Sequence, residues 1–184
     1  MPIASSGSCA LATSDDFNAP ALGLQWQWNH NPDDSHWSLT DRRGSLMIKA
    51  QPADSLKACR NMLTQKVIGY QSESTVLLTA SGDCYAGLCC TGRQFRGIGI
   101  CHEGIFLEAG GKREIIRRGE YPQLWLRITN DSQRNIHQFA YSTDGRHFSP
   151  AGFPFPMRSG FWKGIRIGLF CYGTNGKAWF DEFR

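Results

Sequence analysis

The sequence predicts an all-β sandwich of two antiparallel sheets, and three observations carry this prediction. Glycines and aromatic residues are plentiful, with 20 Gly, 11 Phe, 6 Trp and 5 Tyr in 184 residues, which favours short strands joined by turns. About a dozen short apolar segments, bounded by Gly, Ser or Asp, recur at intervals of about 8–15 residues. No segment of useful length has the helical period of 3.6 residues. A chain of this length is expected to form one domain with a sizeable core.

The expected strands begin in a tryptophan-rich stretch. Three of the six tryptophans lie close together there: Trp26, Trp28 and Trp37. Alternation over residues 24–30 places Leu24, Trp26 and Trp28 on one face, which predicts both tryptophans in the core. Residues 45–50 alternate in the same way. Residues 55–66 come nearest to a helical pattern, but their second half also suits a strand.

The later segments continue the pattern. Residues 123–129 alternate regularly, and residues 135–142 continue into Asp144-Gly145, a strong hairpin signal. Two further strands are expected within residues 164–183. Between them and the hairpin, residues 153–164 combine two prolines with four aromatic rings, which predicts a rigid loop that presents a ring outward and forms the functional edge of the domain.

Several classes of function are disfavoured by the composition. The formal net charge is only +4 and the basic residues are scattered, unlike the dense one-sided footprint of a nucleic-acid-binding protein. No apolar run approaches the ~20 residues of a membrane span. The five histidines lack zinc spacing. Acidic neighbours such as Asp33-Asp34 point to opposite faces of a strand, and no Gly-x-Ser-x-Gly or Glu-x-Asp-x-x-Glu motif occurs, so we expect no catalysis by this chain alone.

The cysteines and the N-terminus indicate location and boundaries. Most of the seven cysteines lie among apolar residues, where free Cys behaves as a small hydrophobe; reduced thiols and the lack of a signal peptide favour a cytoplasmic location. Residues 1–14 are small and polar and are interpreted as a linker that follows another domain. The sandwich itself is expected over residues 15–184.

A calcium site is the one metal hypothesis that the acids support. In a jelly roll the first and last strands often pair, so Asp15 or Asp16 is expected near Asp181. Carboxylates and backbone carbonyls are the oxygen ligands that calcium takes. The alternative is that the neighbouring phenylalanines are core residues and the acids are solvated.

Read together, these segments resemble the C-terminal β-sandwich of glycoside hydrolase family 43, the family of β-xylosidases and α-arabinofuranosidases. The resemblance covers nearly everything after residue 13, and the order and spacing of the segments make it specific. The matching segments are Thr13–Pro32, Trp37–Ala50, Cys59–Lys66, Ala86–Cys90, Ile98–Ile100, Leu124–Ile128, Tyr141–Gly152 and Gly164–Phe183. It implies a concanavalin A-like jelly roll and a role in xylan or arabinan processing.

The resemblance also implies a missing partner. In this family the catalytic carboxylates lie on an N-terminal β-propeller, and a loop of the sandwich can place an aromatic ring at the pocket for xylo- or arabino-oligosaccharides. That loop corresponds to "SGFWKG" here, which indicates Phe161 as the lid residue and Trp162 as the second candidate. Trp162 stands where a small residue is commoner, which leaves the register between the two open. The main alternative is a free-standing carbohydrate-binding module, which requires an exposed aromatic platform.

Overall fold

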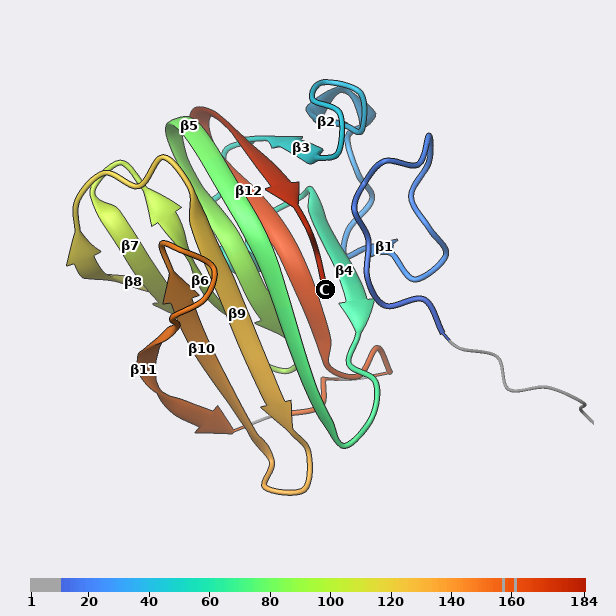
Figure 1. Ribbon diagram of the computed structural model, residues 1–184, viewed down its shortest axis with the longest axis vertical. Helices are drawn as coiled ribbons and strands as arrows, with labels where there is room; N and C mark the ends of the chain where they lie inside the picture. The colour runs from blue at the N-terminus through green and yellow to red at the C-terminus, as the bar shows by residue number, and fades with distance from the viewer. Residues whose placement is uncertain (1–10, 157, 161) are drawn as a thin grey trace, which may run out of the picture.

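The computed structural model describes residues 11–156, 158–160 and 162–184 (Figure 1). Within these ranges it contains twelve strands and two short 3₁₀ helices, so the all-β prediction is confirmed. No helix in these ranges is long and apolar enough to cross a membrane. The elements are β1 (Gln27–Trp28), η1 (Asp34–His36), β2 (Trp37–Ser38), β3 (Leu46–Lys49), η2 (Leu56–Ala58), β4 (Met62–Lys66), β5 (Gln71–Thr91), β6 (Arg96–Cys101), β7 (Gly104–Ala109), β8 (Lys112–Arg118), β9 (Leu124–Asp131), β10 (Ile136–Ser142), β11 (Ser149–Pro156) and β12 (Arg166–Asp181).

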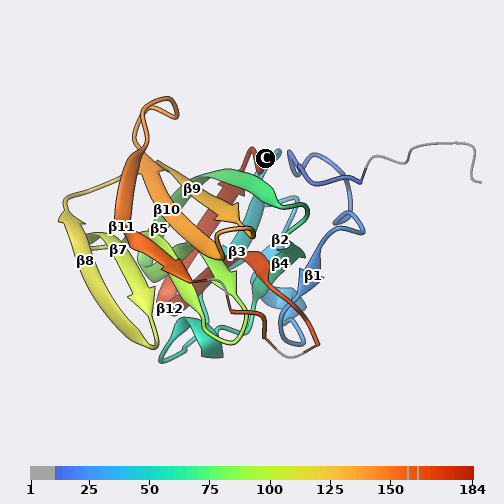
Figure 2. The same ribbon diagram turned by 90° about the horizontal axis from the view of Figure 1, so that it is seen from below.

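Two long strands, β5 and β12, pair with each other over most of their length and belong to both layers of the sandwich. The first half of β5 pairs with β9 and its second half with β6. β12 pairs first with β4 and then with β3. Layer one therefore has the order β1-β4-β12-β5-β6-β7-β8, and layer two has the order β2-β3-β12-β5-β9-β10-β11 (Figures 1 and 2).

Glycines allow β5 and β12 to stay in contact where they pass from one layer to the other. A Cβ on Gly82, which has φ +78°, would lie 2.3 Å from the carbonyl oxygen of Asn175. A Cβ on Gly173, at φ +145°, would lie 2.6 Å from the carbonyl oxygen of Asp83. The register of the two strands shifts at this point. Any other residue at either glycine would strain this bend.

The main core lies between the layers and is built from alternate residues of the strands. Leu124, Leu126 and Ile128 of β9 are fully buried, whereas the residues between them are half-buried on the other face. Leu46, Ile48 and Ala50 belong to this core, whereas Met47 is buried outside it, so the prediction that these three share one face is confirmed. All six cysteines of the described ranges are free and five of them are buried, as expected for small hydrophobes.

A second apolar cluster covers the outer face of layer one. Its buried members are Leu56, Cys59, Met62, Cys89, Phe106, Phe170 and Tyr172. The 3₁₀ helix η2 lies over this face, and Glu108 fixes it there: the buried carboxylate accepts a hydrogen bond from the Leu56 N–H at 2.7 Å and another from the Tyr172 hydroxyl. Both oxygens of Glu108 are thereby used inside the protein.

Candidate functional site

The tryptophan-rich stretch 24–30 is only partly a strand, because β1 is two residues long. Trp26 is 8% exposed and belongs to the main core, while half-buried Trp28 packs against it. Leu24 is fully exposed, so the prediction that it shares their face is wrong. A turn explains this: the Trp26 N–H donates to the Gly23 carbonyl at 3.1 Å, which breaks the alternation before β1 begins.

Trp26 joins the two ends of the domain. Its ring stacks on Phe17 with centroids 5.8 Å apart and meets Phe183 edge-on at 4.9 Å. Its indole N–H donates to Asp15 Oδ2 at 2.7 Å. A buried tryptophan whose polar group is satisfied in this way is a structural anchor. The stretch that contains it is therefore a structural feature of the fold.

The first and last segments pair as expected, through a bridge between Asp15 and Phe183. The Asp15 carboxylate is already occupied, since it accepts hydrogen bonds from the Phe17 N–H and from the Trp26 and Gln25 side chains. The other two carboxylates each accept one short-range backbone bond: Asp16 from Asn18 N–H and Asp181 from Glu182 N–H.

These bonds make Asp15 a poor fit for calcium, because a bound ion would compete with three donors for its oxygens. Across residues 11–156, 158–160 and 162–184, no three His, Cys, Asp or Glu side chains are grouped to hold a metal ion. Calcium binding by Asp181 with Asp15 or Asp16 stays a prediction. If it occurs, millimolar calcium should raise the melting temperature relative to a chelator, and identical melting curves would remove it.

The proline-rich segment 149–156 is a strand, which corrects the prediction of a loop starting at residue 153. β11 lies at the edge of layer two and pairs only with β10. An edge strand tolerates proline because its outward backbone positions need no N–H donor. Phe155 is buried in the core, whereas Phe153 is 91% exposed. A β-bulge in the pairing with β10 separates the two rings.

The segment after β11 carries the predicted lid residues. Phe161 lies outside the described residues. Trp162 is 85% exposed, with the Lys163 ammonium 5.5 Å from its ring centroid. Lys163 also donates to the carbonyl oxygen of Asn29 at 3.0 Å. The exposed indole is therefore held next to the end of β1.

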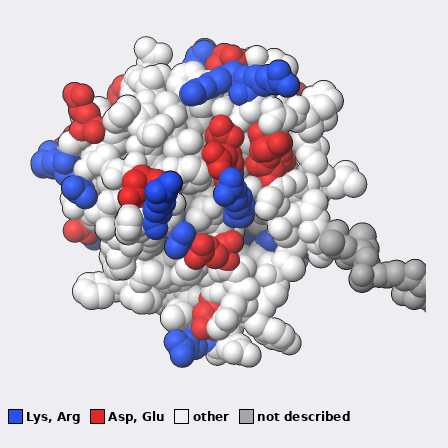
Figure 3. Space-filling view, in the orientation of Figure 1, with Lys and Arg blue, Asp and Glu red and all other residues white. Residues whose placement is uncertain are grey.

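Part of the exposed apolar surface lies on the side of the domain that contains β1. In Figures 1 and 2 the chain from residue 11 and β1 lie opposite β8 and β11. Among the described residues, the exposed large apolar side chains are Leu11, Leu24, Ile68, Tyr70, Phe153 and Trp162. Of these, Phe153 belongs to β11, and Tyr70 lies against the β9–β10 turn, where its carbonyl accepts from the Ser132 N–H. Over the face drawn in Figure 3, acidic and basic side chains are intermixed. The exposed apolar residues on the β1 side are what a docked domain would cover.

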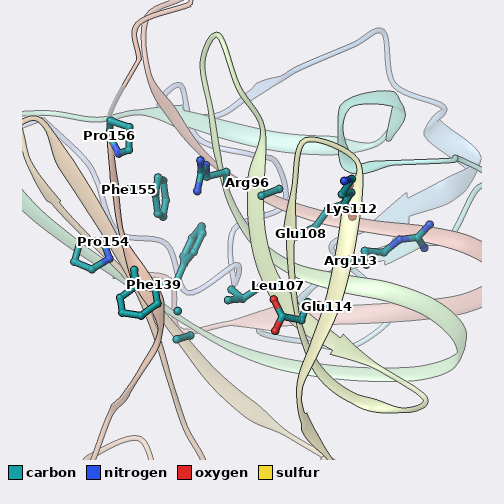
Figure 4. A pocket seen from close by; sticks show the side chains of 14 residues that line it. Arg96, Leu107, Glu108, Lys112, Arg113, Glu114, Phe139, Pro154, Phe155 and Pro156 are labelled. Atoms are coloured by element: carbon teal, nitrogen blue, oxygen red, sulfur yellow. The ribbon is translucent and has the colours of Figure 1, made fainter.

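A groove of about 640 Å³ opens between the edge strands β8 and β11, at the opposite end of the sandwich (Figure 4). Phe139 of β10 and Phe155 of β11 form its apolar wall. The charged side chains of Lys112 and Glu114, both from β8, line the other side, whereas the Arg113 side chain points away from the groove and over Tyr85. The groove therefore pairs aromatic rings with charged groups, which is the composition of a ligand pocket.

Next to this groove, Cys90, His137 and Asn130 form a buried polar set. The Asn130 side-chain oxygen accepts from His137 Nδ1–H, so Nε2, 3.3 Å from the Cys90 sulfur, accepts from the thiol. Burial lowers the pKa of His137 to about 4 and raises the pKa of the Cys90 thiol to about 12. The adjoining cavity holds only about 10 Å³. The three residue types match those of a catalytic set, with Cys as nucleophile, His as base and Asn as the group that orients the His. Here the thiol and the imidazole are both neutral and no substrate has room to reach them, so we interpret the three residues as part of the packed core.

The outer face of layer one does not present an open aromatic platform in the described part of the chain. Phe106, Phe170 and Tyr172 are buried in the second cluster. Tyr85 is half-buried, with the Arg113 guanidinium 4.3 Å from its ring centroid. A free-standing carbohydrate-binding module would need these ring faces free for stacking against sugars.

The family is decided by a match along almost the whole chain. The model of the β-xylosidase C-terminal concanavalin A-like domain matches residues 14–184. The chain belongs to this family. The match confirms the resemblance to glycoside hydrolase family 43 and the concanavalin A-like sandwich.

The relatives of this family 43 domain are larger proteins. It is 58% identical over 167 residues to a putative β-xylosidase of Xylanibacter ruminicola, covering 91% of this chain and 32% of that protein. It is 31% identical over 201 residues to a β-xylosidase of Formosa agariphila, covering 92% of this chain and 33% of that protein. A bifunctional GH43-CE protein from Bacteroides eggerthii matches with TM-score 0.83 and 30% identity, over 93% of this chain and 27% of that one. The chain thus spans about a third of the curated relatives it matches.

Sequence reasoning missed two features of this family 43 domain, the groove and the buried histidine. The groove is lined by residues from β6, β7, β8, β10 and β11, which no local pattern brings together. For His137 a signal existed: in "IHQFAYS" it alternates with the core residue Phe139, so both face inward.

Proposed function

We propose that this chain is a non-catalytic ancillary domain of a family 43 β-xylosidase or α-arabinofuranosidase. It packs against a β-propeller that carries the catalytic carboxylates, and it shapes or caps the pocket that takes xylo- or arabino-oligosaccharides. The observation that carries this proposal is the coverage of the relatives: this domain is about a third of proteins named β-xylosidase, so about two thirds of each lies outside it.

The exposed side near β1 supports the placement of the partner. Trp162 has an accessible ring face, and the hydrogen bond from Lys163 to Asn29 holds its segment beside β1. Indole rings stack against the C–H faces of sugars and carry a large apolar contact area. In the assembled protein the partner domain covers this side, and Trp162 borders the substrate pocket.

A chimera tests the role of Trp162. The domain replaces the matching third of the Xylanibacter ruminicola relative, and hydrolysis of aryl xylosides is measured. Trp162→Ala should lower kcat/KM by about fivefold to tenfold, Trp162→Phe should restore part of the loss, and the melting temperature of the isolated domain should not change. The domain alone should give no turnover, because its catalytic partner is absent.

Arg134→Ala is the matched control, since Arg134 is exposed in the β9–β10 turn, away from β1. It should leave the kinetics of the chimera at the parent level. Unchanged kinetics in Trp162→Ala, with a lowered melting temperature, would show that the ring only covers the sandwich. Turnover by the isolated domain would contradict the ancillary role itself.

A further inference from the structure

The edge groove between β8 and β11 has an apolar wall built from layer two. Phe139, Ala151 and Phe155 are buried side chains that face it from layer two, and Phe153 projects from β11 at its rim. The volume of about 640 Å³ lies within the usual range for small-ligand pockets. Of these rings Phe153 is exposed, and the flat C–H face of a pyranose is complementary to a free phenyl ring.

Positive charge dominates the polar lining. Arg96 and Lys112 line the groove, and an adjoining hollow of about 450 Å³ adds Lys57 and Arg93. None of these four side chains makes an ion pair with a carboxylate of the described residues.

Two carboxylates line the same hollows, but only one is available. Glu108 is buried, and its two oxygens already accept hydrogen bonds from the Leu56 N–H and the Tyr172 hydroxyl. Glu114 is exposed on β8. Four unpaired cations against one accessible carboxylate give these hollows a positive potential, which attracts an anionic ligand.

Arg96 is placed to recognise that anion. It lines both hollows, and its guanidinium carbon lies 4.8 Å from the ring centroid of Phe155 (Figure 4). The stacking restrains the guanidinium, which binds carboxylates through two parallel hydrogen bonds. The Arg96 guanidinium, which can donate to a carboxylate, thus lies in a groove that also presents an apolar ring.

We propose that this edge groove binds an acidic saccharide, an oligosaccharide that bears a uronic acid. The sugar ring lies against the exposed ring of Phe153, and the uronate carboxylate binds Arg96, which the buried Phe155 ring holds in place. The choice of a sugar rests on the proposed function, whereas the choice of an acidic one rests on the charges of the groove. β8 and β11 lie opposite β1 (Figures 1 and 2), so the groove stays open when a partner domain covers the β1 side.

Titration calorimetry on the chain alone tests the proposal. The probes are xylotriose and xylotriose carrying one glucuronic acid. The acidic probe should bind at least about tenfold more tightly, and its affinity should fall as salt is raised. Arg96→Gln should remove most of this preference, Arg96→Lys should keep part of it, and Phe153→Ala should weaken binding of the acidic probe. Equal affinity for the two probes, or no binding of either at millimolar concentration, would overturn the proposal.

Arg134→Gln controls for net charge, because it also removes one exposed positive charge, but from the β9–β10 turn. If both Gln variants weakened binding equally, the effect would be nonspecific attraction and the site would be rejected. Equal binding of a sulfated glycan without uronic acid would likewise reject recognition of the carboxylate. These measurements use the chain alone and need no propeller. A negative result would therefore not affect the test of Trp162 in the chimera, and a negative result in the chimera would not affect the test of the groove.

Discussion

Replacing Trp26 with alanine should lower the free energy of unfolding by about 3–5 kcal/mol, the cost of truncating a large buried aromatic side chain. The substitution removes two ring contacts at once, with Phe17 near the start of the domain and with Phe183 at its end. It also removes the indole donor of Asp15, whose carboxylate then keeps fewer partners. The loss should be measured by urea unfolding with an unchanged slope.

Two neighbours provide matched controls in the same stretch. Leu24→Ala should change the unfolding free energy by less than about 0.5 kcal/mol, because the side chain is fully exposed. Trp28→Ala should give a smaller loss than Trp26→Ala, because Trp28 is half-buried and its ring contacts Trp37 at 5.3 Å. A Trp26→Ala variant that unfolds like the parent but has lost sugar binding would make Trp26 a ligand residue.

The strands that could be predicted from the sequence are those in which burial on one face sets a period of two. In β9, Leu124, Leu126 and Ile128 alternate with half-buried neighbours, because one face of the strand packs on the core and the other is partly exposed to solvent. The same reasoning was right for Trp26 but failed for Leu24, because a turn closed by a backbone hydrogen bond interrupts the period before β1. A hydrogen bond of this kind leaves no mark on the hydrophobic pattern.

The prolines of β11 misled the prediction for a different reason. Proline removes a backbone donor, so a run containing Pro154 and Pro156 is disfavoured inside a sheet, and the sequence does not say which strand lies at an edge. Edge position is a property of topology, and here β11 pairs only with β10. The same limit applies to the groove, since Arg96 and Phe155 are brought together only by the order of strands in two layers.

Acidification from pH 6.5 to about 4 should destabilise the domain by about 3 kcal/mol through His137 alone. The side chain is 1% exposed, and burial lowers its pKa from 6.5 to about 4. A depressed histidine pKa means that the unfolded chain takes up the proton first, so this stability is present above pH 6.5 and is lost as the pH falls. The change should already reach about 1 kcal/mol at pH 5.5.

The surroundings of His137 explain why its imidazole stays neutral. Nδ1 donates to Asn130, Nε2 accepts from the neutral Cys90 thiol, and the ring stacks on Phe155. The charged groups nearby are Arg96, over the same Phe155 ring, and Arg158, which lines the small cavity beside the histidine. Both are cations, and the described residues place no carboxylate against His137, so nothing there compensates an imidazolium.

Unfolding free energies measured in urea from pH 7.5 to 4.5 test this, with His137→Gln and His137→Phe as variants that cannot titrate. Both should lose the slope of the parent, whatever their absolute stability. His147→Gln is the control: hydrogen bonding to Asp144 raises the pKa of exposed His147, so its contribution is present at low pH, is lost as the pH rises and has the opposite sign. The Ser35 hydroxyl lowers the pKa of Asp33 to about 2. Protonation of this carboxylate therefore changes the stability only below about pH 3.8, outside the measured range. A parent slope that survives in both His137 variants would show that another group binds the proton.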